Sequence, residues 1–156
     1  MAQLHILAIG KSKKSPEAAL TQDYMSRLPK GSTIFESESR LPYGSARQAD
    51  ESKRLLDIYD AKKPKTARLI AMDPLGDNIA SPALADYISS QRDAGISSLF
   101  FAIGGADGHD EALLARADKR LSFGAATWPH MLFRAMLAEQ LYRAEMIIKN
   151  HPYHKV

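Results

Sequence analysis

Three polar side chains with rings lie within four residues near the end of the chain: His151, Tyr153 and His154. Histidine exchanges protons near neutral pH, and both ring types donate hydrogen bonds and stack on nucleobases. These residues predict a segment that contacts a planar substrate and handles a proton. The alternative is an ordinary frayed end. A zinc site is disfavoured, because His130 is the only other histidine close by in the sequence and no carboxylate or thiol adjoins these histidines.

A run of mostly small residues comes before the last expected helix. It consists of Phe123, Gly124, Ala125, Ala126, Thr127 and Trp128. Small side chains let a flat ring lie against the backbone, whose amides and carbonyls can then contact the ring edge. Trp128 would wall such a site, although a lone tryptophan is more often part of a core. Thr127 has an alternative role as the cap of the following helix.

The final helix, expected over residues 131–149, is apolar around most of its circumference. Its apolar residues are Leu132, Phe133, Met136, Leu137, Leu141, Ala144, Met146, Ile147 and Ile148. Such a helix needs cover from more than its own sheet, so we expect a homodimer in which two copies pack through it. The alternative is a fully interior helix. Arg134 and Arg143 fall on the narrow polar side and are expected in solvent, with Glu139 and Arg143 forming an i,i+4 pair.

Two further loops carry residues that suit an anion. Residues 104–108 read Gly-Gly-Ala-Asp-Gly directly after an apolar strand, and glycines there let backbone amides approach a ligand. The spacing lacks both the dinucleotide fingerprint and the Walker lysine, so a tight turn explains this loop about as well. Lys11, Lys13 and Lys14 follow the first strand and either contact phosphates or form a solvated loop.

The elements that position these segments alternate along one domain, residues 1–156. Ser15-Pro16 and Ser81-Pro82 each predict a helix start, and a turn is expected at residues 73–76. Strand 97–103 is apolar on both faces, which is typical of a parallel sheet between helix layers. The pattern predicts an α/β fold with strands at 4–10, 32–37, 68–72, 97–103 and 121–123 and helices at 16–27, 46–61, 81–94, 110–117 and 131–149.

Composition sets broad limits on the class of protein. The net charge is +3 and 45% of residues are hydrophobic, which is ordinary for a globular protein with a slight preference for anionic partners. There is no cysteine, so disulfides and thiolate metal sites are excluded. Neither a membrane-spanning run nor a signal peptide is visible, and we expect a cytoplasmic protein.

Together these motifs carry a specific resemblance. The chain resembles the ribosomal RNA large subunit methyltransferase H (RlmH) family of the SPOUT class through Ala8-Ile9-Gly10-Lys11, Ile103-Gly104-Gly105-x-x-Gly108, Leu121-Ser122-Phe123, Thr127-x-Pro129-His130, Arg134, Glu139-Gln140-x-Tyr142-Arg143-Ala144 and His151-Pro152-Tyr153-His154. The match spans the whole chain and is densest after Ser97. A string of spaced motifs that ends in this tail is far more specific than any one of them.

The resemblance implies an S-adenosylmethionine-dependent enzyme that methylates ring nitrogen 3 of a pseudouridine in 23S rRNA. It implies cofactor contacts at Met72, at Gly104 and along residues 123–128. Methionine at position 72, where the family commonly has leucine, should keep an apolar wall. The resemblance further implies a C-terminal trefoil knot and a homodimer whose active site borrows the partner's tail.

Within that reading, Tyr153 and His154 are expected to orient the base or accept its proton, and Arg143 to stabilise charge on the uracil oxygens. The modest net charge suggests that the substrate is the assembled ribosome rather than free RNA. A rival from another class is a non-catalytic RNA-binding or ribosome-binding module with the same fold. A second rival is a phosphate-ligand or nucleotide enzyme that uses the glycine loop.

Overall fold

The structure, a computed structural model, describes residues 1–154, which form a five-stranded parallel sheet covered by helices on both faces. Lys155 and Val156, the last residues of the predicted tail, lie outside the described residues. The strands are β1 (Gln3–Ile9), β2 (Ile34–Ser37), β3 (Ala67–Asn78), β4 (Ser98–Ile103) and β5 (Lys119–Ser122), in the spatial order β2-β1-β4-β3-β5. The predicted parallel α/β architecture is therefore confirmed.

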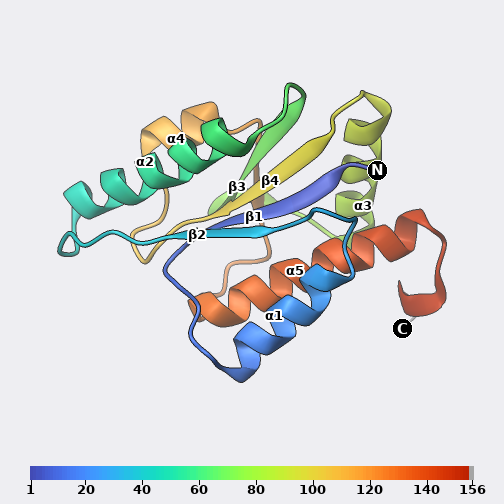
Figure 1. Cartoon of the computed structure of the whole chain (residues 1–156), viewed down its shortest axis with the longest axis horizontal. Helices are drawn as coiled ribbons and strands as arrows, with labels where there is room; N and C mark the ends of the chain where they lie inside the picture. The colour runs from blue at the N-terminus through green and yellow to red at the C-terminus, as the bar shows by residue number, and fades with distance from the viewer. Residues whose placement is uncertain (155–156) are drawn as a thin grey trace.

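Helices lie in two layers (Figure 1). On one face are α2 (Ser45–Lys62) and α4 (Glu111–Arg116). On the other are α1 (Pro16–Ser26), α3 (Ser81–Asp93) and α5 (His130–Ile148), with α5 packed against both of its neighbours. The central strands β1 and β4 carry apolar side chains on both faces, so each helix layer encloses a hydrophobic core of its own.

Helix starts follow local signals in some cases only. The Ser15 hydroxyl accepts a hydrogen bond from the Ala18 amide, as the Ser-Pro motif predicts. At the second such motif the prediction is wrong in detail, because Ala80 is the N-cap and the Ser81 hydroxyl donates to Gln140 instead. Thr127 does not cap α5 either. The N-cap position is occupied by Pro129, and no side chain caps this helix.

The turn predicted at residues 73–76 is wrong. Strand β3 continues through these residues to Asn78, with a shift of register against β5 between Met72 and Asp77. Gly76 makes this path feasible, since a Cβ there would lie 2.7 Å from the backbone carbon of Arg120. The longer strand holds β5 at the sheet edge, and β5 leads directly into the small-residue loop.

Candidate functional site

The predicted cofactor contacts lie at one level of three adjacent strands, at the carboxyl ends of β4 and β5 and at Met72 within β3. Met72 pairs with Ile103 of β4 on one side and with Leu121 of β5 on the other. Gly104 directly follows Ile103, and Phe123 directly follows β5. Parallel strands bring their carboxyl ends to one edge, where ligands of such sheets bind. Residues between 19 and 51 positions apart along the chain (Gly104 to Phe123, and Met72 to Phe123) thus come together through the sheet register.

The loop at residues 123–128 leaves its small residues open to a ligand. Residues 125–128 are exposed, and Trp128 keeps 40% of its surface accessible, so the alternative of a core tryptophan is wrong. Gly124 has φ +101°, a conformation that favours glycine, and its carbonyl accepts a hydrogen bond from the Ser122 hydroxyl. Phe123 turns inward against Phe133, with ring centroids 5.6 Å apart.

These residues fit a cofactor that carries a flat ring. Met72 supplies a buried apolar wall, whereas the glycine at position 104 is required by its own loop, because a Cβ there would lie 3.1 Å from the Gly108 backbone carbon. The exposed loop at residues 123–128 supplies small side chains and accessible backbone groups. Across the described residues, His, Asp and Glu do not gather into a group that could hold a metal ion.

The glycine loop is a closed turn rather than an open cradle. Gly105 and Gly108 form a backbone bridge, and the Gly108 amide donates to the Gly105 carbonyl at 3.0 Å. The carboxyl group of Glu51, from α2, presses against Gly105, where a Cβ would lie 2.5 Å from its Oε2. This arrangement favours the tight-turn interpretation over a phosphate site. Burial raises the pKa of Glu51, and the nearby Arg47 only partly opposes that shift.

Arg134 is not in solvent, contrary to the sequence-based prediction. It is 2% exposed and donates to the carbonyls of Ile9 and Gly10 at 3.2 and 2.8 Å. It also forms an ion pair with Glu36 and donates to His130 Nε2 at 3.1 Å. The long side chain thereby fastens the ends of β1 and β2 to the first turn of α5. The carbonyls require a hydrogen-bond donor, which the guanidinium supplies, and its charge is paired with Glu36.

Two neighbouring groups respond to this arginine. Partial burial acts to raise the pKa of Glu36, but hydrogen bonds from Ser12 and Arg134 outweigh it and lower the pKa. Burial, and then the charge of Arg134, lower the pKa of His130 to about 4. Ser12 donates from both its amide and its hydroxyl to Glu36, which fixes the loop that carries the three exposed lysines Lys11, Lys13 and Lys14.

The tail is packed rather than frayed. After Asn150, which has a positive φ of 54°, residues Pro152–His154 form a short 3-10 helix that folds back along α5. The Tyr153 hydroxyl donates to Glu139 at 3.1 Å and lies 3.3 Å from the Tyr24 hydroxyl. The predicted Glu139–Arg143 pair is confirmed, at 2.6 Å.

Arg143 joins the predicted tail residues into one cluster. It donates to His154 Nδ1 at 3.4 Å, and its guanidinium lies 5.1 Å from the Tyr153 ring centroid. Burial and hydrogen bonds to Tyr24 and Glu139 raise the pKa of Tyr153, so its hydroxyl stays protonated at neutral pH. Sequence reasoning missed Tyr24, which contacts Tyr153 from 129 positions away.

Within one chain the tail cluster and the small-residue loop are separated along α5. The loop lies before His130, whereas the tail contacts Glu139 and Arg143, nine and thirteen residues further on, which at 1.5 Å per residue is about 14 to 20 Å along the helix. Figure 1 shows the tail beside the carboxyl-terminal end of α5. Within residues 1–154 no hydrogen bond or ion pair joins these two predicted clusters, which we call half-sites.

An open groove of about 480 Å³ runs between these half-sites, along α5 and beside α1 and the start of α3. Leu20 and Leu132 line it and leave 45% and 37% of their surfaces exposed. Phe123 lines one part of the groove, whereas Glu139 and Tyr24 of the tail cluster line another. No helix among residues 1–154 is long and apolar enough to cross a membrane.

Comparison with known proteins gives a consistent family. The protein-family model described as "Predicted SPOUT methyltransferase" matches residues 2–154 of the chain. The "Ribosomal RNA large subunit methyltransferase H" of Rhodospirillum rubrum is 45% identical over 154 residues, which cover 98% of this chain and 99% of the relative. The protein of that name from Paramagnetospirillum magneticum is 44% identical over 154 residues with the same coverage.

One solved structure supports the fold independently. A probable methylase family protein from Haemophilus influenzae superposes with a TM-score of 0.58 at 10% identity. The superposition covers 96% of this chain and 67% of that one. At this identity the likeness concerns the arrangement of strands and helices alone.

Proposed function

The chain belongs to the SPOUT methyltransferase family and, within it, to the ribosomal RNA large subunit methyltransferases H, and we propose that it methylates ring nitrogen 3 of a pseudouridine in 23S rRNA. The methyl donor is S-adenosylmethionine, and the substrate is the assembled ribosome, so the enzyme works in the cytoplasm. Membership of the family supports the reaction class. The residues of this chain support the proposed dimer, the cofactor contacts and the roles of the tail residues.

The catalytic unit is a homodimer in which two α5 helices pack antiparallel. The observation that carries this proposal is the separation of the two half-sites along α5, from the residues before His130 to Glu139 and Arg143. A twofold axis that crosses α5 between the two half-sites brings the tail of one copy to the small-residue loop of the other. The exposed apolar residues Leu20 and Leu132 of the groove gain cover in the same step.

S-adenosylmethionine supplies an electrophilic methyl group on a sulfonium. Met72, Gly104 and residues 123–128 are the contacts that hold this cofactor at the strand ends. Their part is to orient the reacting groups and to exclude water, which contributes to the rate through alignment rather than through new bonds to the protein. Trp128, with 40% of its surface exposed, is available to cover the bound ring.

The tail cluster orients the uracil ring and manages its proton. Because the pKa of Tyr153 is raised by burial and by its hydrogen bonds, Tyr153 acts as a hydrogen-bond donor and not as the base. His154 is then the acceptor of the proton on ring nitrogen 3. Arg143, held in position by Glu139, stabilises the negative charge that develops on the uracil oxygens.

Phosphate contacts position the enzyme on the ribosome. Lys11, Lys13 and Lys14 are exposed at the same sheet edge as the cofactor contacts, on a loop fixed by Ser12 and Glu36. Such contacts orient a protein on RNA without reading its sequence. With a net charge of only +3, the shaped surface of the ribosome supplies the remaining selectivity.

The test is transfer of tritiated methyl groups from S-adenosylmethionine to intact ribosomes, to separated subunits and to free rRNA. We expect labelling of ribosomes, with the label on ring nitrogen 3 of a pseudouridine after digestion. Equal labelling of free rRNA would refute the ribosome requirement. Failure to bind S-adenosylmethionine in calorimetry would favour the rival, a non-catalytic ribosome-binding module.

A further inference from the structure

A strongly exposed aromatic ring stands on the loop between β2 and α2. Tyr43 leaves 74% of its surface accessible, compared with 40% for Trp128. One face of its ring is covered by the guanidinium of Arg47, whose Cζ lies 4.4 Å from the ring centroid. The guanidinium therefore makes a cation–π contact with the Tyr43 ring, and the high exposure of Tyr43 leaves ring surface accessible to a ligand.

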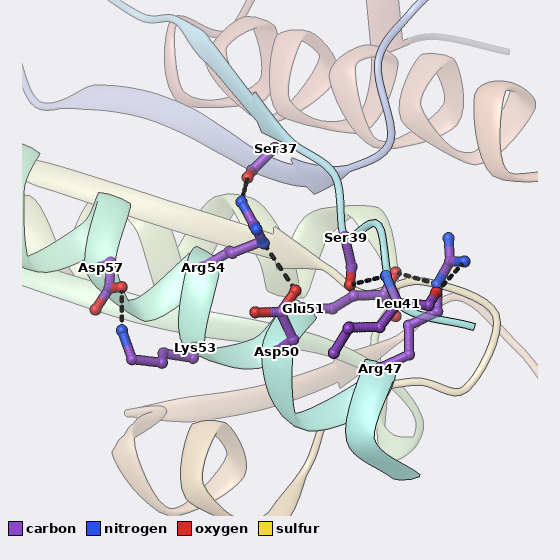
Figure 2. A network of polar contacts seen from close by, with 9 residues as sticks. All are labelled: Ser37, Ser39, Leu41, Arg47, Asp50, Glu51, Lys53, Arg54 and Asp57. Atoms are coloured by element: carbon purple, nitrogen blue, oxygen red, sulfur yellow. Dashed lines mark hydrogen bonds and ion pairs between the residues drawn. The ribbon is translucent and has the colours of Figure 1, made fainter. Parts of the chain in front are cut away.

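The loop that presents this ring, residues 38–44, is fixed in shape (Figure 2). The Ser39 hydroxyl accepts a hydrogen bond from the Leu41 amide at 3.2 Å. Arg47 donates to the Leu41 carbonyl at 3.0 Å, so the residue under the Tyr43 ring also clamps the loop backbone. A ring held this way loses little conformational freedom when something stacks on it.

The first turns of α2 join this loop to the glycine loop beside the cofactor contacts. Arg47 pairs with Glu51 at 3.5 Å, and the Glu51 carboxyl group presses against Gly105. Gln48 donates to the carbonyls of Asp107 and His109 at 2.7 and 3.3 Å. The first turns of α2 therefore contact both the exposed ring and the loop that carries Gly104.

The surroundings of this ring favour RNA over protein. β2 lies beside β1 in the sheet, so the loop after β2 emerges at the same edge as the lysines that follow β1. Arg40 of the loop itself is exposed. Aromatic rings backed by guanidinium groups and flanked by cations are the usual platform for unpaired bases.

We propose that Tyr43 is a stacking platform for an unpaired nucleobase that flanks the target nucleotide. This inference rests on the proposed function, because the flanking base belongs to the same rRNA substrate. The stack on Tyr43 holds the RNA strand next to the target nucleotide. The target base then enters the active site that the two half-sites form together. Arg47 is a positioning residue that fixes the orientation of the Tyr43 ring and holds the loop backbone at Leu41.

The kinetic test compares Tyr43→Ala, Tyr43→Leu and Tyr43→Phe in the full-length protein. Loss of one stacked base should raise the KM for ribosomes on the order of tenfold in the alanine and leucine variants. The phenylalanine variant should behave like the original protein, because it keeps the ring. The kcat of all variants and their affinity for S-adenosylmethionine, measured by calorimetry, should stay within about twofold, which also controls for folding.

A leucine variant with an unchanged KM would overturn the proposal, since apolar bulk would then suffice. A photoreactive benzoylphenylalanine at position 43 gives a second readout through crosslinking to ribosomes. Crosslinks to rRNA support stacking, whereas crosslinks to ribosomal protein alone, or none, overturn it. If the unaltered protein fails to methylate ribosomes, the proposed function fails, and crosslinking still decides the role of Tyr43.

Discussion

Replacing Arg134 by methionine should lower the free energy of unfolding by about 3 kcal/mol. The side chain is 2% exposed, and methionine keeps its apolar stem but removes every donor. The carbonyls of Ile9 and Gly10 then lose buried hydrogen bonds, at roughly 1 kcal/mol each. The lost ion pair with Glu36 supplies the rest.

The loss of stability in Arg134→Met depends on how well the Glu36 carboxylate is stabilised without its partner. Breaking a fully buried ion pair costs about 3–5 kcal/mol, because one charge stays unpaired. Glu36 is 27% exposed and keeps two hydrogen bonds from Ser12, so we expect the lost pair to cost only about 1 kcal/mol, below that range. Arg116→Met is the matched control, since the Arg116–Asp60 pair is 44% and 46% exposed and should contribute less than about 1 kcal/mol.

Urea unfolding followed by circular dichroism measures both variants, at one protomer concentration because association adds to apparent stability. A cycle with Glu36→Gln separates the Arg134–Glu36 coupling, expected at about 1 kcal/mol, from the loss of the two carbonyl bonds. If Arg134→Met cost no more than Arg116→Met, the reasoning about burial would be refuted.

Two further predictions concern pH. Burial raises the pKa of Glu51, so the folded state prefers the protonated carboxyl, and this contribution is lost as the pH rises through the raised pKa. Glu51→Gln should therefore gain stability relative to the original protein between pH 5 and pH 8, and equal differences in urea unfolding at both pH values would contradict this. For His130, whose pKa falls to about 4 through burial and then the charge of Arg134, the folded state prefers the neutral ring. Stability should fall by about 1–2 kcal/mol, after allowance for solvent screening, between pH 6.5 and pH 4, and His130→Asn should reduce that slope in the same assay.

Elements governed by local signals were predictable from the sequence. The Ser15 cap and the buried β4 depend on neighbouring residues and on apolar character, both of which the sequence displays. Ser81 failed as a cap because a distant partner, Gln140, takes its hydroxyl. The helix still begins there, with proline in its first turn.

Errors arose where a residue's partner is remote in the chain. Arg134 sits on an otherwise apolar helix and was assigned to solvent, but its partner Glu36 lies 98 residues away on β2. Proline and glycine predict a turn at residues 73–76. Pairing with β5 overrode that local preference and extended β3 to Asn78.

The site was predictable to the extent that it follows from parallel strands. Met72, Gly104 and Phe123 lie close because Met72 pairs with Ile103 at the end of β4 and with Leu121 of β5, whereas their role as cofactor contacts is implied by the family resemblance. The contact of Tyr153 with Tyr24 was not predictable, because no local pattern links residues 129 apart. The trefoil knot and the cofactor contacts themselves stay predictions.

The most direct measurement mixes two defective chains. One carries Tyr153→Ala with His154→Ala, and the other carries Gly124→Val, where φ +101° disfavours any side chain. After co-refolding in equal amounts, random pairing should restore roughly a quarter of the original methyl transfer to ribosomes, because half the dimers are mixed and each has one complete site. Activity no greater than the sum of the two separate variants would contradict an active site shared between chains.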